Sequence, residues 1–366
     1  MTSLADLPLR DDLRGKQPYG APQLHVPVEI NVNENTFGIP DDVAADIISA
    51  VAAAVKGMNR YPDREFVQLR EALAGYVGHG VTVDHVWAAN GSNEVLQQIL
   101  QAFGGPGRTL MSFPPTYSMY PLLADGTQTR YVAGTRSTDY TLDPAITAAQ
   151  VAAENPDLVV ICSPNNPTGT AIDLETIERV YDATQGIVIV DEAYHEFGGP
   201  DAPTAIDLLP GRPRLLVSRT MSKAFAFAGA RLGYLIADPA VADALRLVRL
   251  PYHLSALTQA AATAALGHAD RMLENVDAIC RQRDRMITGL TELGYQPYPS
   301  AANFVFFAAV ASPETVFNTL LQHGVLIRNM GIPHTLRVTA GTEWETGRFL
   351  EEMAALGPGA VQADEQ

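Results

Sequence analysis

The middle of the chain alternates short apolar segments with longer amphipathic ones, and this alternation limits the possible folds most. The apolar segments have the length of strands, and the sequence between them has the period of helices. Strands that are apolar on both faces are typical of a mostly parallel sheet covered by helices on both sides. We therefore predict an α/β fold, with strands at residues 86–89, 109–113, 128–132, 158–162, 187–190, 215–218 and 232–236.

The two ends of the chain differ from this pattern. Residues 1–40 contain frequent Pro and Gly and little periodicity, so we expect an N-terminal arm. Residues 41–250 carry the alternation and form the predicted large domain, and residues 251–366 predict a smaller α+β domain. The expected elements of the small domain are helices 256–266, 272–293, 313–323 and 343–356 and strands 303–308 and 336–339.

Composition excludes several classes of function. The formal net charge of −16 disfavours a nucleic-acid partner, because phosphates repel an acidic protein. Only two cysteines occur among 366 residues, so neither a disulfide framework nor a thiolate metal site is indicated, and we expect no metal. The first twelve residues lack the pattern of a signal peptide, and no apolar run has the length of a membrane span. A cytoplasmic protein is expected.

Four clusters of polar residues lie at the carboxyl ends of predicted strands. They lie at residues 91–93, 165–169, 191–194 and 220–223. In open α/β sheets, ligands bind outside the carboxyl ends of the strands. The four clusters are therefore expected to form one site.

Lys223 is the residue around which this site is expected to form. The chain has 25 Lys plus Arg but only three lysines, Lys16, Lys56 and Lys223, so it uses arginine for ordinary surface charge. An amine can lose its proton and form a Schiff base, which a guanidinium cannot do. Small and apolar neighbours of Lys223 favour a lowered pKa. The alternative is an ordinary surface lysine.

The remaining polar residues suit pyridoxal 5′-phosphate. Asp191, at the end of a buried strand, is a candidate to keep a heteroaromatic nitrogen protonated and so make the ring an electron sink. A helix start, hydroxyl groups and a guanidinium suit a phosphate, whereas amide and phenol groups suit a ring oxygen and an aromatic ring suits stacking. The respective candidates are Ser92, Asn93, Thr220, Ser222 and Arg231 for the phosphate, Asn166 and Tyr194 for the ring oxygen, and Tyr117 for stacking.

Each of these features has a simpler explanation when taken alone. Residues 91–93 resemble a plain helix N-cap, and residues 165–169 resemble a turn. Arg231 suits a surface ion pair, and Tyr117 and Tyr194 suit half-buried packing positions. Their occurrence together, in this order and at the strand ends, favours the cofactor site.

Short motifs along nearly the whole chain, from about residue 9 to residue 353, resemble those of fold-type I, class II aminotransferases that depend on pyridoxal phosphate. The pattern is most similar to the histidinol-phosphate branch of that family. The matching motifs lie at residues 33–38, 60–63, 90–94, 115–120, 163–169, 191–194, 219–225, 231–234 and 336–339.

The resemblance implies a role for each site residue. Lys223 bonds to the cofactor aldehyde and moves the substrate proton, with Asp191 and Tyr194 as its catalytic partners. Tyr61 reaches the cofactor phosphate of the neighbouring subunit, which implies a homodimer with sites at its interface. The family positions near the substrate are matched by Tyr19, Asn35, Arg328 and Arg337.

The expected reaction of this branch interconverts histidinol phosphate plus 2-oxoglutarate and imidazole acetol phosphate plus glutamate, in L-histidine biosynthesis. Arg337 is expected to face a carboxylate, with Arg328 converging on it to hold a dianion such as a phosphate. The alternative for Arg328 is an ion pair between domains.

Other functions remain as alternatives. Within the class they are an aromatic (phenylalanine or tyrosine) aminotransferase and a phosphate-selective decarboxylase of the same fold. From other classes, a transcriptional regulator would need a basic DNA-binding region ahead of the domain. A nicotinamide enzyme would need a Gly-x-Gly-x-x-Gly loop after its first strand, and neither feature is found in the sequence.

Overall fold

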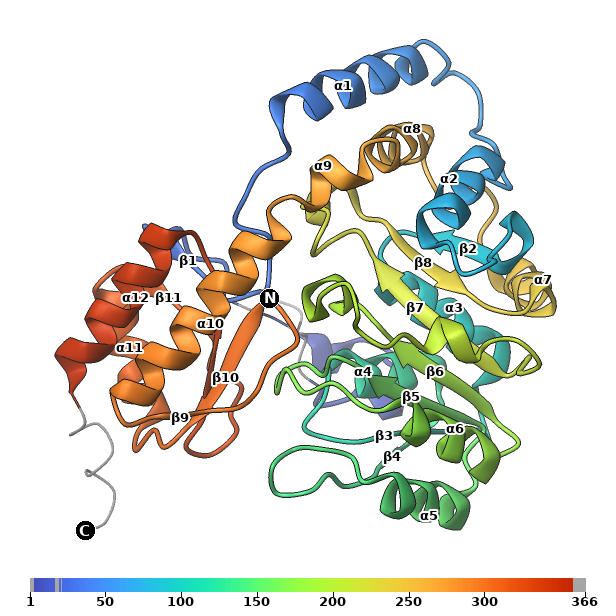
Figure 1. The fold of residues 1–366 in the computed structure, drawn as a ribbon. Coiled ribbons are helices and arrows are strands. Elements are labelled where there is room, and N and C mark those ends of the chain that lie inside the picture. Colours follow the sequence, from blue (N-terminus) through green and yellow to red (C-terminus); the bar gives the residue numbers. More distant parts are fainter. Residues whose placement is uncertain (1–2, 17–19, 21, 358–366) are drawn as a thin grey trace.

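The computed structural model describes residues 3–16, 20 and 22–357. Its larger part is built on a seven-stranded sheet in the order β2-β8-β7-β6-β5-β3-β4 (Figure 1). Only β8 runs against its neighbours, and the other strands are parallel. This mostly parallel sheet confirms the predicted α/β fold. The strands are β2 (Val86–Ala89), β3 (Thr109–Ser112), β4 (Arg130–Ala133), β5 (Leu158–Cys162), β6 (Ile187–Asp191), β7 (Leu215–Thr220) and β8 (Gly233–Ile236).

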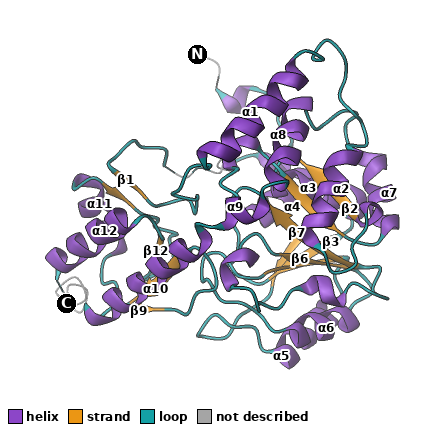
Figure 2. Ribbon diagram, turned by 45° about the horizontal axis from the view of Figure 1, so that its top comes forward, coloured by secondary structure: helices purple, strands orange, loops and turns teal. Residues whose placement is uncertain are grey.

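Helices cover the sheet and extend beyond both of its ends. Figures 1 and 2 show α5 and α6 next to each other near one end, and α1, α2 and α8 near the other. The helices of this part are α1 (Asp41–Val55), α2 (Val67–Val77), α3 (Ser92–Phe103), α4 (Met119–Thr127), α5 (Pro144–Glu154), α6 (Leu174–Ala183), α7 (Pro239–Val248), α8 (Ala256–Leu266) and α9 (Ala269–Leu273). Short 3₁₀ turns lie at Leu4–Asp6, Asp11–Leu13, Val83–His85, His195–Gly198, Ala205–Leu208 and Ala228–Ala230.

The smaller part lies to one side of the sheet and is an antiparallel sheet covered by helices (Figure 1). Its strand order is β12-β10-β9. A separate parallel pair joins β11 to β1 (Val28–Glu29), which comes from the N-terminal arm. The other elements are α10 (Val276–Glu292), β9 (Gln296–Pro297), β10 (Phe304–Ala308), α11 (Pro313–Gln322), β11 (Val325–Leu326), β12 (Leu336–Thr339) and α12 (Glu343–Leu356).

The helix predicted over residues 272–293 differs from the structure. It is interrupted after α9, and α10 begins at Val276 with Asn275 as its N-cap residue. The sequence analysis also did not identify α5 and α7, although each begins with an Asp–Pro pair in which the aspartate side chain caps the first turn.

The hydrophobic core of the large part continues past residue 250, where we predict the domain boundary, and the core of the small part includes residues of the arm. The core of the large part includes residues as far as Met272, because α8 packs against α1 and α2. Val28 and Ile30 of the arm belong to the core of the small part, together with Val305 and Val325. The arm is therefore partly a structural element of the small domain.

Neither a membrane-spanning helix nor a metal-binding cluster is found among the described residues. No helix among them combines the length and the apolar character needed to cross a bilayer. No group of three or more His, Cys, Asp or Glu side chains in residues 3–16, 20 and 22–357 is arranged to hold a metal ion.

Gly233 determines how closely β8 approaches the beginning of α3. A Cβ atom at this position would lie 2.1 Å from the backbone nitrogen of Ser92 and 2.3 Å from the carbonyl carbon of Gly91. Backbone atoms cannot move aside as a flexible side chain can, so only glycine fits here. The position of the α3 N-terminus therefore depends on a glycine in the neighbouring strand.

We predict that Gly233→Ala lowers the free energy of unfolding by about 1–3 kcal/mol, because the added methyl group overpacks the junction of β8 and α3. Denaturant titration measures the change. Gly229→Ala is the matched control, since a Cβ atom there meets nothing within 4 Å, and its effect should stay within about 0.5 kcal/mol. Equal stabilities of the two variants would contradict the prediction.

Candidate active site

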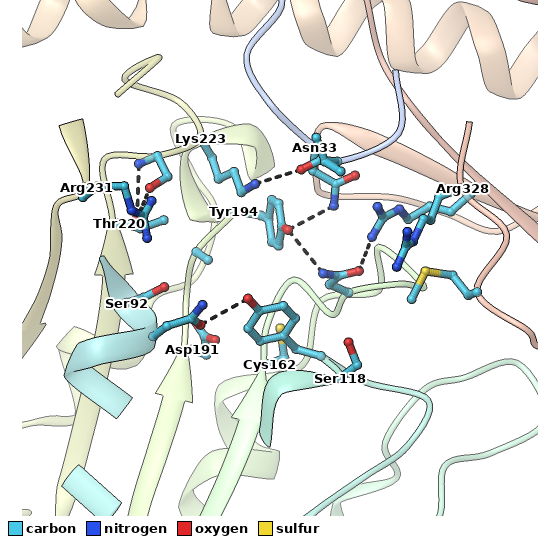
Figure 3. Close-up of a pocket in the computed structure, with 18 residues that line it drawn as sticks. Asn33, Ser92, Ser118, Cys162, Asp191, Tyr194, Thr220, Lys223, Arg231 and Arg328 are labelled. Atoms are coloured by element: carbon cyan, nitrogen blue, oxygen red, sulfur yellow. Dashed lines mark hydrogen bonds between the residues drawn. The ribbon is translucent and has the colours of Figure 1, made fainter. Parts of the chain in front are cut away.

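Three neighbouring parallel strands end at the same level of the sheet. Cys162 of β5 pairs in register with Asp191 of β6, and Asp191 pairs with Ser218 of β7. The loops that follow these strands therefore start together and surround one cavity (Figure 3). The predicted residues that line this cavity are Ser92, Asn93, Tyr117, Asn166, Asp191, Tyr194, Thr220, Ser222, Lys223, Arg231, Arg328 and Arg337.

Lys223 extends into the cavity from the loop after β7 (Figure 3). Its Nζ donates to the backbone oxygen of Val32 at 3.1 Å and lies 5.9 Å from the centre of the Tyr194 ring. Burial lowers the pKa of Lys223 to about 8, and the positive charge of Arg337 contributes to the shift. Near neutral pH an appreciable fraction of this amine is therefore unprotonated, as a nucleophile or base must be.

Asp191 lies at the opposite edge of the cavity and is 2% exposed (Figure 3). Its Oδ2 accepts a hydrogen bond from Tyr120 Oη at 2.9 Å, whereas its Oδ1 has no hydrogen-bond partner among the described residues. Burial raises the pKa of Asp191 to about 6. A buried carboxylate oxygen without a partner costs free energy that a donor or a cation would recover. The cavity thus offers an acceptor for a cationic N–H group.

A hydrogen-bond network connects the three parts of the chain across the cavity. Tyr194 Oη accepts from Asn33 Nδ2 at 3.0 Å and from Asn166 Nδ2 at 3.4 Å. Arg337 Nη1 donates in turn to Asn166 Oδ1 at 2.5 Å. Burial raises the pKa of Tyr194, so its hydroxyl keeps its proton at neutral pH. Tyr194 and Asn166 therefore present donors that suit an anionic oxygen.

The N-terminus of α3 forms an anion cradle with the residues after β7. Gly91 precedes the helix with a φ of 85°, and a Cβ atom there would lie 2.5 Å from Arg231 Nη2. The guanidinium therefore packs directly against the backbone where α3 begins. The hydroxyl oxygens of Thr220 and Ser222 lie 3.0 Å apart beside it. Free helix N–H groups, hydroxyls and a guanidinium together attract a phosphate.

Tyr117 lies just before α4 and supplies the aromatic side of the cavity. Its hydroxyl donates to Asn93 Oδ1 at 3.1 Å. Its ring meets the ring of Tyr120 edge to face, with the centroids 5.5 Å apart. These contacts fix the ring orientation, which suits stacking on a planar ligand.

Arg328 and Arg337 enter the cavity from the small domain. Their backbones form an antiparallel bridge, with N–H···O distances of 2.9 and 3.0 Å, so both side chains lie on the same face. Arg337 is 5% exposed and its Nη2 also donates to the backbone oxygen of Asn31. No ion pair of Arg328 with a described carboxylate is observed, so the alternative of an interdomain ion pair is not supported within the described residues.

Among the described residues, two that the resemblance singles out do not line this cavity, Asn35 and Tyr61. Asn35 does not line the cavity, because its amide donates to the backbone oxygen of Ala224 and its Oδ1 accepts from the N–H of Phe37. The expected contact of Asn35 with the substrate stays a prediction. Tyr61 is 79% exposed and lies outside the cavity of its own chain. Tyr19 lies outside the described residues.

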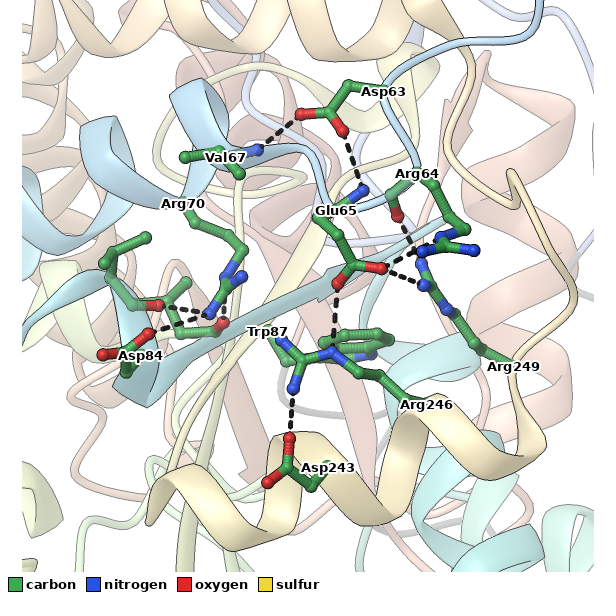
Figure 4. Close-up of polar contacts among 12 residues, drawn as sticks. Asp63, Arg64, Glu65, Val67, Arg70, Asp84, Trp87, Asp243, Arg246 and Arg249 are labelled. Atoms are coloured by element: carbon green, nitrogen blue, oxygen red, sulfur yellow. Dashed lines mark hydrogen bonds and ion pairs between the residues drawn. The ribbon is translucent and has the colours of Figure 1, made fainter.

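The loop that carries Tyr61 is held by an ion cluster (Figure 4). Glu65 accepts from Arg246 at 3.0 Å and also pairs with Arg249, and both guanidinium groups lie over the Trp87 ring. Tyr61 itself stacks on Tyr252 with the ring centroids 4.4 Å apart. An aromatic side chain that is both exposed and held in place suits contact with another molecule.

The sequence analysis did not assign two residues that complete the site. Asn33, in the arm, bonds to Tyr194, and Tyr120 bonds to Asp191. Both stand within motifs that the sequence analysis used, next to residues that were assigned. A three-residue spacing between Tyr117 and Tyr120 is the signal that would have revealed the second tyrosine, because it places both on one side of a helical turn.

These groups fit pyridoxal phosphate. The unpartnered Asp191 Oδ1 suits a pyridinium N–H, and the cradle at α3 suits the phosphate. The amine of Lys223 suits the aldehyde, and Tyr194 and Asn166 carry donors that suit the ring oxygen. The class of protein that this fold and site define is a transaminase that uses pyridoxal phosphate.

Comparison with known proteins agrees with this class. Residues 27–353 match the family model of aminotransferase class I and II, and the chain belongs to that family. It is 62% identical over 358 residues to the histidinol-phosphate aminotransferase of Paenarthrobacter aurescens, covering 97% of this chain and 96% of that protein. It is 53% identical over 366 residues to the protein of the same name from Mycolicibacterium smegmatis, covering 98% and 96%.

Solved structures of the class have the same fold. The crystal structure of histidinol-phosphate aminotransferase from Sinorhizobium meliloti in complex with pyridoxal-5′-phosphate superposes with a TM-score of 0.80 at 27% identity, covering 92% of each chain. The enzyme of that name from Clostridium acetobutylicum superposes with a TM-score of 0.81 at 22% identity, covering 90% of this chain and 98% of that one, which supports the fold alone.

We predict that the rate of pyridoxal phosphate uptake by the apoenzyme rises with pH around a midpoint of about 8, because the neutral amine of Lys223 forms above its lowered pKa. Stopped-flow absorbance of the bound cofactor follows the reaction. Lys223→Ala is the control and should lack covalent uptake. A midpoint close to that of an ordinary lysine, about 10.4, would contradict the assignment.

Proposed function

We propose that this chain transfers an amino group between histidinol phosphate and 2-oxoglutarate, giving imidazole acetol phosphate and glutamate, as a pyridoxal-phosphate-dependent step of L-histidine biosynthesis. The observation that carries the proposal is the cavity that combines the Lys223 amine with the buried, unpartnered Asp191 Oδ1. The names of relatives at 52–62% identity support the substrate.

The cofactor, when bound, supplies an aldehyde carbon for the amino group and a protonated ring that accepts electron density from the substrate Cα. Lys223 would hold the cofactor through its amine, and the free amine would take the proton from the substrate Cα at Nζ. Asp191 Oδ1 keeps the ring nitrogen protonated. Tyr194 Oη and Asn166 Nδ2 hold the ring oxygen, and Tyr117 covers the ring face.

The phosphate of the cofactor is assigned to the cradle at α3. Ser92, Asn93, Thr220 and Ser222 supply N–H and hydroxyl donors, and Arg231 supplies the charge. Binding at a helix N-terminus fixes one end of the cofactor. The other end of the cofactor would then face Lys223 and Asp191.

Arg328 and Arg337 are assigned to the anionic groups of the substrates. Both guanidinium groups reach the cavity from adjacent backbone positions, so they can bind one dianion together. A phosphate on the amino donor and a carboxylate on 2-oxoglutarate both meet this requirement. The alternative donor is phenylalanine or tyrosine, as in aromatic aminotransferases, which carries one carboxylate and no phosphate.

The active form is proposed to be a cytoplasmic homodimer. Tyr61 is held on the surface of one subunit, and we assign its hydroxyl to the cofactor phosphate of the other subunit. A groove between α1, α2 and α8 opens beside the same loop and is lined by Val67, Ala256, Ala260 and Ala264. A second copy of the chain is the proposed occupant of this surface.

We predict that histidinol phosphate is a far better amino donor than phenylalanine. We also expect Arg328→Gln to raise the KM for histidinol phosphate by about tenfold or more, through loss of a charge-assisted hydrogen bond. Steady-state kinetics with both donors measures this. Arg348→Gln is the control, because it removes a half-buried arginine of α12 that pairs with Glu351 away from the cavity. A preference of the wild type for phenylalanine would overturn the proposed substrate.

We predict that subunits carrying Tyr61→Phe and subunits carrying Lys223→Ala complement each other when mixed dimers form. One site of each mixed dimer then contains an intact Lys223 and an intact Tyr61 from the other chain, so activity exceeds the average of the two parents. Co-expression with two affinity tags isolates the mixed dimer. Activity equal to that average would mean that Tyr61 acts within its own subunit or not at all.

A further inference from the structure

We propose that Tyr120 is a positioning residue for the cofactor ring. Its hydroxyl binds Asp191 Oδ2, and this contact leaves Oδ1 directed at the ring nitrogen and favours the anionic carboxylate. The inference rests on the proposed function, since it requires pyridoxal phosphate in the cavity.

The contact is direct and lies in the interior. Tyr120 Oη donates to Asp191 Oδ2 at 2.9 Å, with Tyr120 1% and Asp191 2% exposed (Figure 3). One oxygen of the carboxylate is thereby occupied, and the other has no partner among the described residues. A carboxylate held at one oxygen cannot rotate freely, so the direction of Oδ1 is set before any ligand enters.

The start of α4 and the residues just before it supply both tyrosines of the ring site. Tyr117 precedes α4 and Tyr120 lies in its first turn, three residues later. The edge-to-face contact of their rings, 5.5 Å between centroids, ties the two orientations together. The start of α4 therefore sets both the aromatic surface for the ring and the direction of the carboxylate at the ring edge.

The other titratable groups near Asp191 do not take over the role of the Tyr120 hydroxyl as its hydrogen-bond donor. Burial and the charge of Asp191 raise the pKa of Cys162 to about 12, so its thiol stays neutral. The charge of Glu192 raises the pKa of Asp191, but Glu192 is paired with Arg219 at 2.8 Å. Burial raises the pKa of Tyr120 well above its usual value, so Tyr120 remains a donor at every physiological pH.

Removal of the hydroxyl has a predictable direction. Burial is the main effect that raises the pKa of Asp191, and the hydrogen bond from Tyr120 is the largest effect that lowers it. Without that bond the carboxyl group stays protonated to higher pH. A protonated carboxyl group cannot hold a pyridinium, so binding of the cofactor should weaken first on the acidic side of neutrality.

The test is Tyr120→Phe with two cofactors on the apoenzyme. The first is pyridoxal phosphate, and the second is its analogue with a C–H group in place of the ring nitrogen. We expect Tyr120→Phe to lower the affinity for pyridoxal phosphate by about tenfold near neutral pH, as for the loss of a hydrogen bond to a charged group. The pH below which affinity declines should rise, and affinity for the analogue should match that of the wild type.

Tyr131→Phe is the matched control, because it removes a hydroxyl that bonds to Ser112 at 2.6 Å in the same domain without contacting Asp191. Equal losses with both cofactors, or no loss with either, would overturn the role of Tyr120. Failure of the wild type to bind pyridoxal phosphate would instead overturn the proposed function.

A second variant covers the case in which Tyr120→Phe does not fold. Replacement of Tyr120 by 3-fluorotyrosine keeps the shape and makes the hydroxyl a stronger donor. The pH below which pyridoxal phosphate affinity declines should then fall relative to wild type. An unchanged or raised value would overturn the inference.

Discussion

The burial of one carboxylate at the end of β6 is the constraint on which the rest of the site depends. Asp191 is taken out of water by the sheet itself, since its neighbours in register are residues of β5 and β7. A charge in such a place is tolerated only if hydrogen bonds or an opposite charge compensate it. Tyr120 donates a hydrogen bond to Oδ2, whereas Oδ1 has no partner among the described residues and is open to a ligand. The site is thus prepared electrostatically for a cation.

At Lys223, burial acts on a group that is cationic when charged, and it lowers the pKa. There the same exclusion of water, together with nearby guanidinium charge, favours the neutral amine. Acid and amine therefore face a common cavity with pKa values that both approach neutrality, one from below and one from above. Groups with such displaced pKa values are typical of catalytic sites. The structure provides this arrangement by placing both residues after adjacent parallel strands.

Much of this was predictable from the sequence, because strand ends in a parallel sheet must meet at one edge. Lys223, Asp191 and Asn166 each follow an apolar strand, and the structure places all three in one cavity. The contribution of Asn33 was not predictable, since the arm has no periodicity that fixes its path. Tyr120 was given no role from the sequence, and its hydrogen bond to Asp191 shows its place in the site. The break between α9 and α10 was not predictable, because the helical period of the sequence continues through it.

The pairing of β1 with β11 determines when the core of the small part can form during synthesis. Val28 pairs with Val325, so the two ends of the chain build one small core. During synthesis the arm leaves the ribosome first, whereas its partner strand emerges after the entire large domain. Strand β1 of the arm therefore has no partner strand until β11 has been synthesised. Asn33, which donates to the Tyr194 hydroxyl, is also bonded to Thr339 of β12, so the last strand of the chain helps to fix this contact.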